Sequence, residues 1–115
     1  MNDIMSFGLH RIWKQELIKK IRIKEQDMIL DLATGSGDLL ELIKKKSNCI
    51  CVGYDSNIKM MMQAKKKLKK QKIFYINGMA EKIPFKTNTF DFITLSFGLR
   101  NFNNIPKSLM EIKRV

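Results

Sequence analysis

The sequence predicts an α/β fold in which parallel strands alternate with helices. Short apolar runs, such as Met28–Leu30 and Ile73–Ile76, are typical of strands that helices cover on both faces. Between these runs, apolar residues recur at helical spacing. A glycine turn, Gly35-Ser36-Gly37, joins the first strand directly to the helix after it. Together these patterns predict a βαβαβ arrangement in a single domain.

Each element has its own apolar pattern. We expect strands at 28–32, 50–54, 73–77 and 90–96, and helices at about 3–21, 37–46, 57–70 and 105–114. Right-handed crossovers place the first strand centrally, which gives the strand order 3-2-1-4. The carboxyl ends of the strands then meet at one edge, where open α/β sheets bind their ligands. The N-terminal helix is predicted to pack over the domain through Ile12, Trp13, Leu17 and Ile21.

The segment Leu30–Asp38 has the form of a nucleoside-binding corner. Gly35 and Gly37 allow backbone N–H groups at the start of the helix to approach a ligand closely. A dinucleotide fingerprint needs a third small residue where this chain has Leu40, and no Gly-Lys-Ser/Thr motif marks a phosphate-binding loop. An adenosine without phosphates remains, and S-adenosylmethionine fits that description.

A carboxylate follows the second strand. Asp55 comes directly after Ile50–Tyr54, where it is placed to accept hydrogen bonds from both ribose hydroxyls. As an alternative, Asp55 is only a favourable charge at the start of the next helix. The residues expected to bind the cofactor at this edge are Asp31, Gly35, Ser36, Gly37, Asp55, Met79, Ala80 and Ser96.

Composition and charge limit the other functions. The 115 residues are 44% hydrophobic and 29% charged, as expected of one soluble globular domain, and no apolar run is long enough to span a bilayer. Much of the net charge of +11 lies in Lys59–Lys72. Ile58, Met61, Ala64 and Leu68 are expected to form the buried stripe of that helix. Its lysines then form a solvated face, so an RNA-binding module is the less favoured hypothesis.

The two cysteines predict neither a disulfide nor a metal site. Cys49 and Cys51 are too close for an unstrained disulfide and lack the further ligands of a zinc site. We therefore expect two small buried side chains and no metal. Free cysteines and the absence of a signal-peptide pattern at Met1 predict a cytoplasmic protein.

Three segments resemble one family of enzymes. They are Met1–Trp13, Leu30–Asp38 and Ala80–Asn101, and the most specific parts are Met5-Ser-Phe-Gly-Leu-His-Arg11 and Ser96-Phe-Gly-Leu-Arg-Asn101. The chain resembles the ubiquinone/menaquinone biosynthesis C-methyltransferases over essentially its whole length. These are class I enzymes with a Rossmann-like sheet that use S-adenosylmethionine to methylate a ring carbon of a prenylated quinol.

The resemblance implies a role for each cofactor residue. Ser36 and the backbone of Gly35 and Gly37 would meet the methionine end, Asp55 the ribose, Met79 and Ala80 the adenine, and Ser96 the wall beside the fourth strand. Two positions depart from the family, which commonly has Gly at Thr34 and Asn at Met79. Thr34 would disturb the loop if its φ were positive. Met79 can still pack on the adenine.

Three residues are candidates for catalysis. Arg100, with Asn101, would stabilise developing phenolate charge on the quinol or hold the water that takes the proton. The alternative for Arg100 is an exposed loop arginine without a special role. His10, the only histidine, is a secondary candidate for the general base, and a structural role on the first helix is the alternative.

The resemblance also implies that the chain holds about half of a class I methyltransferase and stops before a fifth strand. The fourth strand would then lie at an unpaired edge, so we expect poor solubility and marginal folding. The alternative is an inactive fragment or relic that at most binds S-adenosylmethionine. The implied partners are a prenylated quinol, a membrane surface, and a homodimer or quinone-biosynthesis complex, without nucleic acid. The implied location is the cytoplasm, or the mitochondrial matrix in a eukaryote, at the periphery of the inner membrane.

Overall fold

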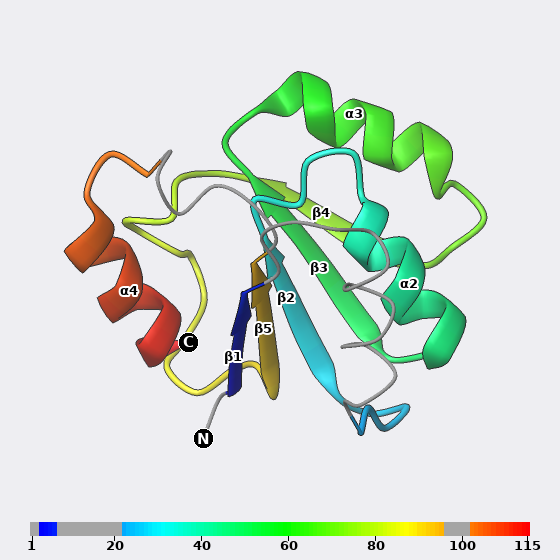
Figure 1. Cartoon of the computed structure of the whole chain (residues 1–115), viewed down its shortest axis with the longest axis horizontal. Coiled ribbons are helices and arrows are strands. Elements are labelled where there is room, and N and C mark those ends of the chain that lie inside the picture. The colour runs from blue at the N-terminus through cyan, green and yellow to red at the C-terminus, as the bar shows by residue number, and fades with distance from the viewer. Residues whose placement is uncertain (1–2, 7–21, 96–101) are drawn as a thin grey trace.

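Five parallel strands form one sheet in the order β1-β5-β2-β3-β4 (Figure 1). The computed structural model describes residues 3–6, 22–95 and 102–115. In chain order the elements are β1 (Asp3–Ser6), β2 (Met28–Leu32), α2 (Asp38–Lys46), β3 (Ile50–Asp55), α3 (Ile58–Lys67), β4 (Ile73–Asn77), β5 (Phe92–Leu95) and α4 (Ile105–Arg114). The predicted order 3-2-1-4 corresponds to β4-β3-β2-β5 and is confirmed.

Helices cover both faces of this sheet. α2 and α3 lie over one face and α4 over the other (Figure 1). Because successive side chains of a strand point to opposite faces, Ile29 packs with α2 in one core and Leu30 packs beneath α4 in the second. Neither side chain has any exposed surface. The first three residues of β2, Met28–Leu30, form a continuous apolar run because both faces of this central strand are buried.

The N-terminal segment corrects one expectation. Residues 3–6 form a strand rather than the start of a helix, and Ile4 lies opposite Ile93 in parallel register with β5. A strand here satisfies backbone N–H and C=O groups that β5 would otherwise leave unpaired. The edge of β5 is therefore covered, contrary to the expectation of an unpaired fourth strand. The rest of the predicted helix, residues 7–21, lies outside the described residues.

The buried stripe of α3 also differs from the prediction at one position. Met61, Ala64 and Leu68 are buried as expected, whereas Ile58 is 58% exposed. At 3.6 residues per turn, Ile58 lies closer to the line of exposed Met62 than to that of Ala64. The first residue of α3 consequently points away from the sheet.

The two cysteines are buried, as the sequence predicts. Cys49 and Cys51 are buried free thiols whose Sγ atoms lie 3.6 Å apart. Within residues 22–95 and 102–115, no group of three or more His, Cys, Asp or Glu side chains could hold a metal ion. No helix in the same ranges is both long enough and apolar enough to cross a membrane.

The last turn of α4 is tied to the segment before β5. The Arg114 guanidinium donates hydrogen bonds to the carbonyls of Ile83 (2.9 Å) and Phe85 (2.8 Å), and its Nε donates to Glu111 at 2.6 Å. The Ile83 N–H donates to the same Glu111 carboxylate at 2.8 Å. This network fixes α4 against the polypeptide that carries one wall of the cavity described below.

We expect Glu111→Gln to weaken the pH dependence of stability. The hydrogen bond from Arg114, with a smaller contribution from the Ile83 N–H, holds the pKa of Glu111 below its ordinary value. A lowered folded-state pKa adds stability that is present above the unfolded pKa, about 4.3, and is lost as the pH falls through the folded pKa. Urea unfolding measured from about pH 7 to about pH 3 should therefore show a shallower fall in unfolding free energy for the variant.

Glu25→Gln is the control, because Glu25 is exposed and the substitution removes the same charge outside this network. The assignment is wrong if Glu111→Gln retains the wild-type dependence on pH.

Candidate functional site

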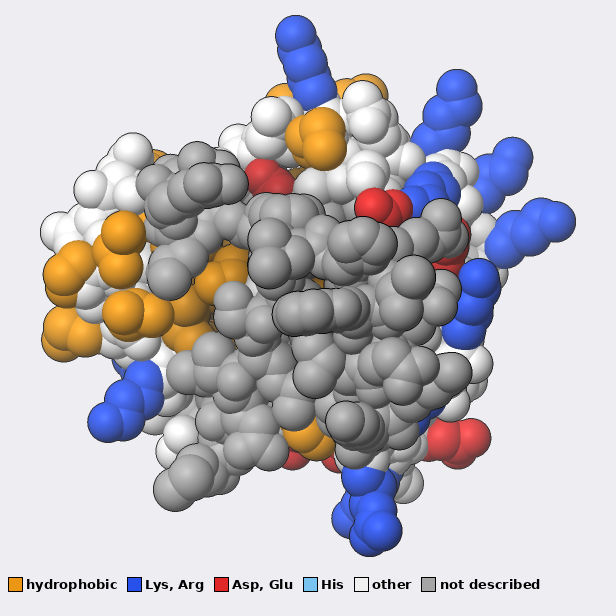
Figure 2. Space-filling model, in the orientation of Figure 1, with side chains coloured by type: hydrophobic (Ala, Val, Ile, Leu, Met, Phe, Trp, Pro, Cys, Tyr) orange, Lys and Arg blue, Asp and Glu red, His pale blue; other side chains and the backbone are white. Residues whose placement is uncertain are grey.

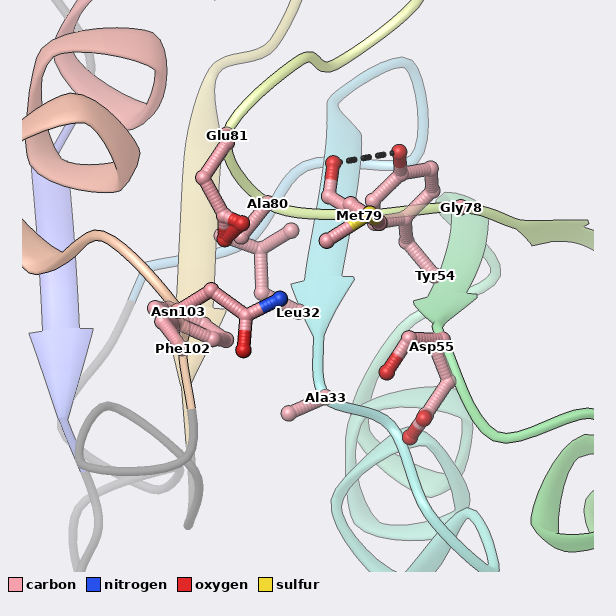
Figure 3. A pocket seen from close by; sticks show the side chains of 11 residues that line it. Leu32, Ala33, Tyr54, Asp55, Gly78, Met79, Ala80, Glu81, Phe102 and Asn103 are labelled. Carbon is pink, nitrogen blue, oxygen red and sulfur yellow. Dashed lines mark hydrogen bonds between the residues drawn. The ribbon is translucent and has the colours of Figure 1, made fainter.

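A cavity of about 320 Å³ opens at the carboxyl ends of β2 and β3. Figure 3 shows Asp55 at one end and Glu81, Phe102 and Asn103 at the other. The cavity is lined by Leu32, Ala33, Tyr54, Asp55, Ser56, Gly78, Met79, Ala80, Glu81, Phe102 and Asn103. Its volume lies within the range of small-molecule sites, about 300 to 1,000 Å³. It lies at the sheet edge where the sequence predicts a ligand.

Asp55 is held in one orientation by two backbone groups. The N–H of Gly35 donates to Oδ2 at 2.8 Å, and the N–H of Asn57 donates to Oδ1 at 2.7 Å. The residue is 9% exposed and forms part of the cavity wall. A carboxylate oxygen has two lone pairs, so each oxygen can accept one more hydrogen bond. Asp55 can thus bind two adjacent hydroxyl groups without losing its present partners.

The glycine loop is fixed from below by a buried carboxylate. Asp31 is 1% exposed, and it accepts hydrogen bonds from the hydroxyls of Thr34 and Thr94, each at 2.7 Å. The Thr34 N–H also donates to the carbonyl of Tyr54 at 3.2 Å. Positive φ values in this segment fall on Ala33 (53°), Gly35 (54°) and Gly37 (85°), and not on Thr34. Thr34 therefore anchors the loop rather than disturbing it.

Gly37 packs the loop against α3. Its φ is 85°, and a Cβ at this position would lie 3.1 Å from both the Ala64 Cβ and the Leu68 Cδ1. Any other residue would be strained in this backbone conformation and would push α2 away from α3. Packing and backbone conformation are therefore sufficient to require glycine at this position.

Tyr54 supports the wall of the cavity that carries Met79 and Ala80. Its hydroxyl donates to the carbonyl of Met79 at 2.7 Å and lies 3.2 Å from that of Lys82. A Cβ on Gly78 would lie 2.2 Å from this hydroxyl, so only glycine fits there. Burial, with smaller effects of Glu111 and Glu81, raises the pKa of Tyr54, which keeps the hydroxyl protonated as a donor.

Glu81 gives the other end of the cavity an acceptor. Its Oε1 accepts a hydrogen bond from the Ser108 hydroxyl at 3.2 Å. Its Oε2 is buried and has no hydrogen-bond partner within the described part of the chain. Leaving a buried acceptor unsatisfied is unfavourable, by about 1 to 3 kcal/mol. This end of the site consequently favours a donor group.

The structure brings together part of the predicted set. Asp55, Met79 and Ala80 line the cavity, and Gly35, Ser36 and Gly37 form the adjoining loop, whereas Asp31 lies buried beneath that loop. Four predicted residues fall outside the described ranges: His10, Ser96, Arg100 and Asn101.

Eight lining residues were not predicted from the sequence. All of them lie within two residues of a predicted position along the chain, which is the signal that could have found them. They are Leu32, Ala33, Tyr54, Ser56, Gly78, Glu81, Phe102 and Asn103.

Comparison with known proteins identifies the family. A model of the ubiE/COQ5 methyltransferase family matches residues 1–115. The chain belongs to this family. It is 46% identical over 123 residues to the ubiquinone/menaquinone biosynthesis C-methyltransferase UbiE of Blochmanniella floridana, which covers 100% of this chain and 48% of that protein. The UbiE of Rickettsia bellii is 44% identical over 124 residues, covering 100% and 50%. The chain thus spans about half the length of these curated relatives.

Solved structures agree with the class I methyltransferase fold. A SAM-dependent methyltransferase from Aquifex aeolicus superposes with a TM-score of 0.73 and 28% identity, over 89% of this chain and 57% of that one. YcgJ from Bacillus subtilis gives a TM-score of 0.84 over 92% of this chain and 46% of that one, and at 24% identity it supports the fold alone.

We expect Tyr54→Phe to destabilise the protein by about 0.5 to 1.5 kcal/mol, because the hydrogen bond from the Tyr54 hydroxyl to the Met79 carbonyl is lost. Tyr75→Phe is the matched control, since the Tyr75 hydroxyl makes only a long contact, 3.5 Å, to the Ala64 carbonyl. Urea unfolding of the two variants measures the difference. Equal destabilisation of both would show that the Tyr54 hydroxyl does not support this wall.

Proposed function

We propose that this chain is the cofactor-binding part of an S-adenosylmethionine-dependent C-methyltransferase. The proposed substrate is a polyprenylated benzoquinol or naphthoquinol of ubiquinone or menaquinone biosynthesis. Membership of the ubiE/COQ5 family and the names of the UbiE relatives support this substrate class. The relatives are about twice as long as this chain, so methyl transfer is proposed for an enzyme that contains this chain.

One observation carries the cofactor assignment. The Asp55 carboxylate is fixed at the tip of β3, in the wall of a cavity, by the N–H groups of Gly35 and Asn57. Its remaining lone pairs suit the adjacent 2′ and 3′ hydroxyls of a ribose. The buried Leu40 takes the position where a dinucleotide fingerprint has a small residue, which favours a nucleoside without a pyrophosphate.

The chain's own residues would bind and orient this cofactor. S-adenosylmethionine, when bound, supplies an electrophilic methyl group on its sulfonium. Asp55 would hold the ribose, and Met79 and Ala80 would contact the adenine. Ser36 and the neighbouring backbone of the glycine loop would face the methionine end, with Ser96 beside it. Fixing the cofactor in this way aligns the methyl group for in-line attack by a ring carbon.

Three further residues are proposed to act on the quinol. Arg100 would stabilise negative charge that develops on the ring oxygen, with Asn101 as a second polar contact. Arg100 itself stays protonated, because a guanidinium does not give up its proton at neutral pH. His10 is proposed as a secondary candidate for the base that removes the proton.

The alternative is a chain that binds the cofactor without catalysis. Both hypotheses expect S-adenosylhomocysteine to bind at Asp55, and only the first expects methyl transfer from S-adenosylmethionine to a demethylated quinol. Binding without transfer would support the alternative. The catalytic hypothesis also includes contacts with a homodimer partner, a biosynthetic complex or the inner membrane.

We expect Asp55→Ala to weaken S-adenosylhomocysteine binding by about 100-fold or more, because two charge-assisted hydrogen bonds to the ribose are lost. Isothermal titration measures the affinity directly. Glu25→Ala is the control, since it removes the same charge from an exposed position outside the cavity. Wild-type affinity in Asp55→Ala would contradict the assignment, as would no binding by the wild-type chain.

Arg100→Lys is expected to lower turnover with little change in cofactor affinity, because lysine keeps the charge but not the planar pair of donors. The measurement is methyl transfer to a demethylated quinol by the active enzyme that contains this chain. Unchanged turnover would remove Arg100 from the mechanism.

A further inference from the structure

One exposed face of α3 combines apolar and basic side chains. Ile58 and Met62 are 58% and 63% exposed, although both are large apolar residues. Lys59, Lys66 and Lys69 are exposed on the same side. At 3.6 residues per turn, the four helical members fall within about 100° of the helix circumference, and Lys69 continues their line just after the helix ends. We call these five residues the α3 surface.

The segment that carries the α3 surface has charge of a single sign. Residues 56–72 contain seven lysines and no acidic residue. Lys67 pairs with Asp38 of α2, and the Lys65 ammonium lies 6.0 Å from the centre of the Tyr75 ring. The exposed lysines of the α3 surface are not among these pairs. Figure 2 shows basic side chains projecting at the top and upper right of the molecule, with apolar side chains at the top.

A hollow lies at the lysine end of this surface. Its volume is about 390 Å³, and Glu41 is the acidic residue in its wall. The hollow is lined by Glu41, Lys45, Lys67, Leu68, Lys69, Lys70 and Gln71. Four lysines contribute to this lining, and one of them, Lys67, is paired with Asp38. The positive charge that remains favours an anionic group such as a phosphate.

The apolar residues decide what kind of anionic partner fits. A polyanion such as RNA would use the lysines but would gain nothing from an exposed isoleucine and methionine. An anionic lipid surface uses both, because lysines attract the headgroups while apolar side chains enter the boundary with the acyl chains. We propose that the α3 surface is a peripheral binding site for anionic phospholipid membranes.

The position of the α3 surface relates it to the cavity. α3 begins two residues after Ser56, which lines the cavity, and Ile58 is its first residue. The apolar end of the surface therefore lies next to the candidate site and the basic end lies further away. This inference rests on the proposed function in one respect, because it assigns a place to the membrane contact proposed there. Vesicle binding needs neither cofactor nor quinol, so its failure and the failure of the proposed function are distinguishable.

The exposed face of α4 offers a matched comparison within the same molecule. Met110 is 72% exposed, more than Met62, and Ile105 and Leu109 are partly exposed. However, Glu111 lies between Lys107 and Lys113 on this helix. α4 therefore has the apolar component without the uniform positive charge.

Sedimentation with lipid vesicles tests the proposal. The 115-residue chain should bind vesicles of phosphatidylcholine mixed with phosphatidylglycerol, and binding should fall as salt rises. Binding to phosphatidylcholine alone should be much weaker. Lys66→Gln with Lys69→Gln should lower the affinity by about 30-fold, and Met62→Ser should lower it by about 10-fold. The matched α4 variants, Lys107→Gln with Lys113→Gln and Met110→Ser, should change it little.

Three results would overturn the proposal. Equal binding to neutral and anionic vesicles would remove the electrostatic part. Sensitivity to the lysine variants but not to Met62→Ser would indicate a general polyanion site, which binding of a polyuridine probe with the same sensitivity would establish. An equal loss in the α4 variants would show that the contact is not specific to the α3 surface. Circular dichroism of each variant verifies that the exposed substitutions leave the fold intact.

Discussion

The cavity depends on the hydrogen bonds that the Asp31 carboxylate accepts. It is almost completely buried in the central strand β2, and it accepts hydrogen bonds from Thr34 of the glycine loop and Thr94 of β5. A buried carboxylate is costly unless donors satisfy it. The loop and the neighbouring strand are therefore held where their hydroxyls reach Asp31. One side chain thus positions two elements that are about 60 residues apart in the sequence.

The same constraint extends from the core to the walls of the cavity. Thr34 is followed directly by Gly35, whose N–H orients the Asp55 carboxylate at the tip of β3. The backbone of Thr34 is also joined to Tyr54, whose hydroxyl supports the opposite wall through Met79. Both sides of the cavity are consequently set before a ligand arrives. A site of this kind loses little conformational freedom on binding.

The sequence predicts those features that follow from local pattern. Apolar runs and a glycine turn are sufficient for the strands and for the position of Asp55, because burial on both faces leaves a continuous apolar signal. They are not sufficient for β1, since a four-residue strand depends on the unpaired groups of β5, which are distant in sequence. Likewise, helical spacing cannot show that Ile58 lies beyond the packed part of α3. Nor can the sequence show that the Asp31 carboxylate accepts hydrogen bonds from Thr34 and Thr94, because that pairing depends on tertiary packing.

The exposed isoleucine and methionine of α3 are more informative than its lysines. Lysines near the carboxyl end of a helix interact favourably with the helix dipole, so Lys65, Lys66 and Lys67 have an explanation within the fold. Ile58 and Met62 have no such explanation, because exposed apolar side chains gain nothing from water or from the dipole. Single exposed apolar residues are common, but two that lie one turn apart beside uniformly positive charge form a pattern. Among anionic partners, a phospholipid surface uses both parts of that pattern.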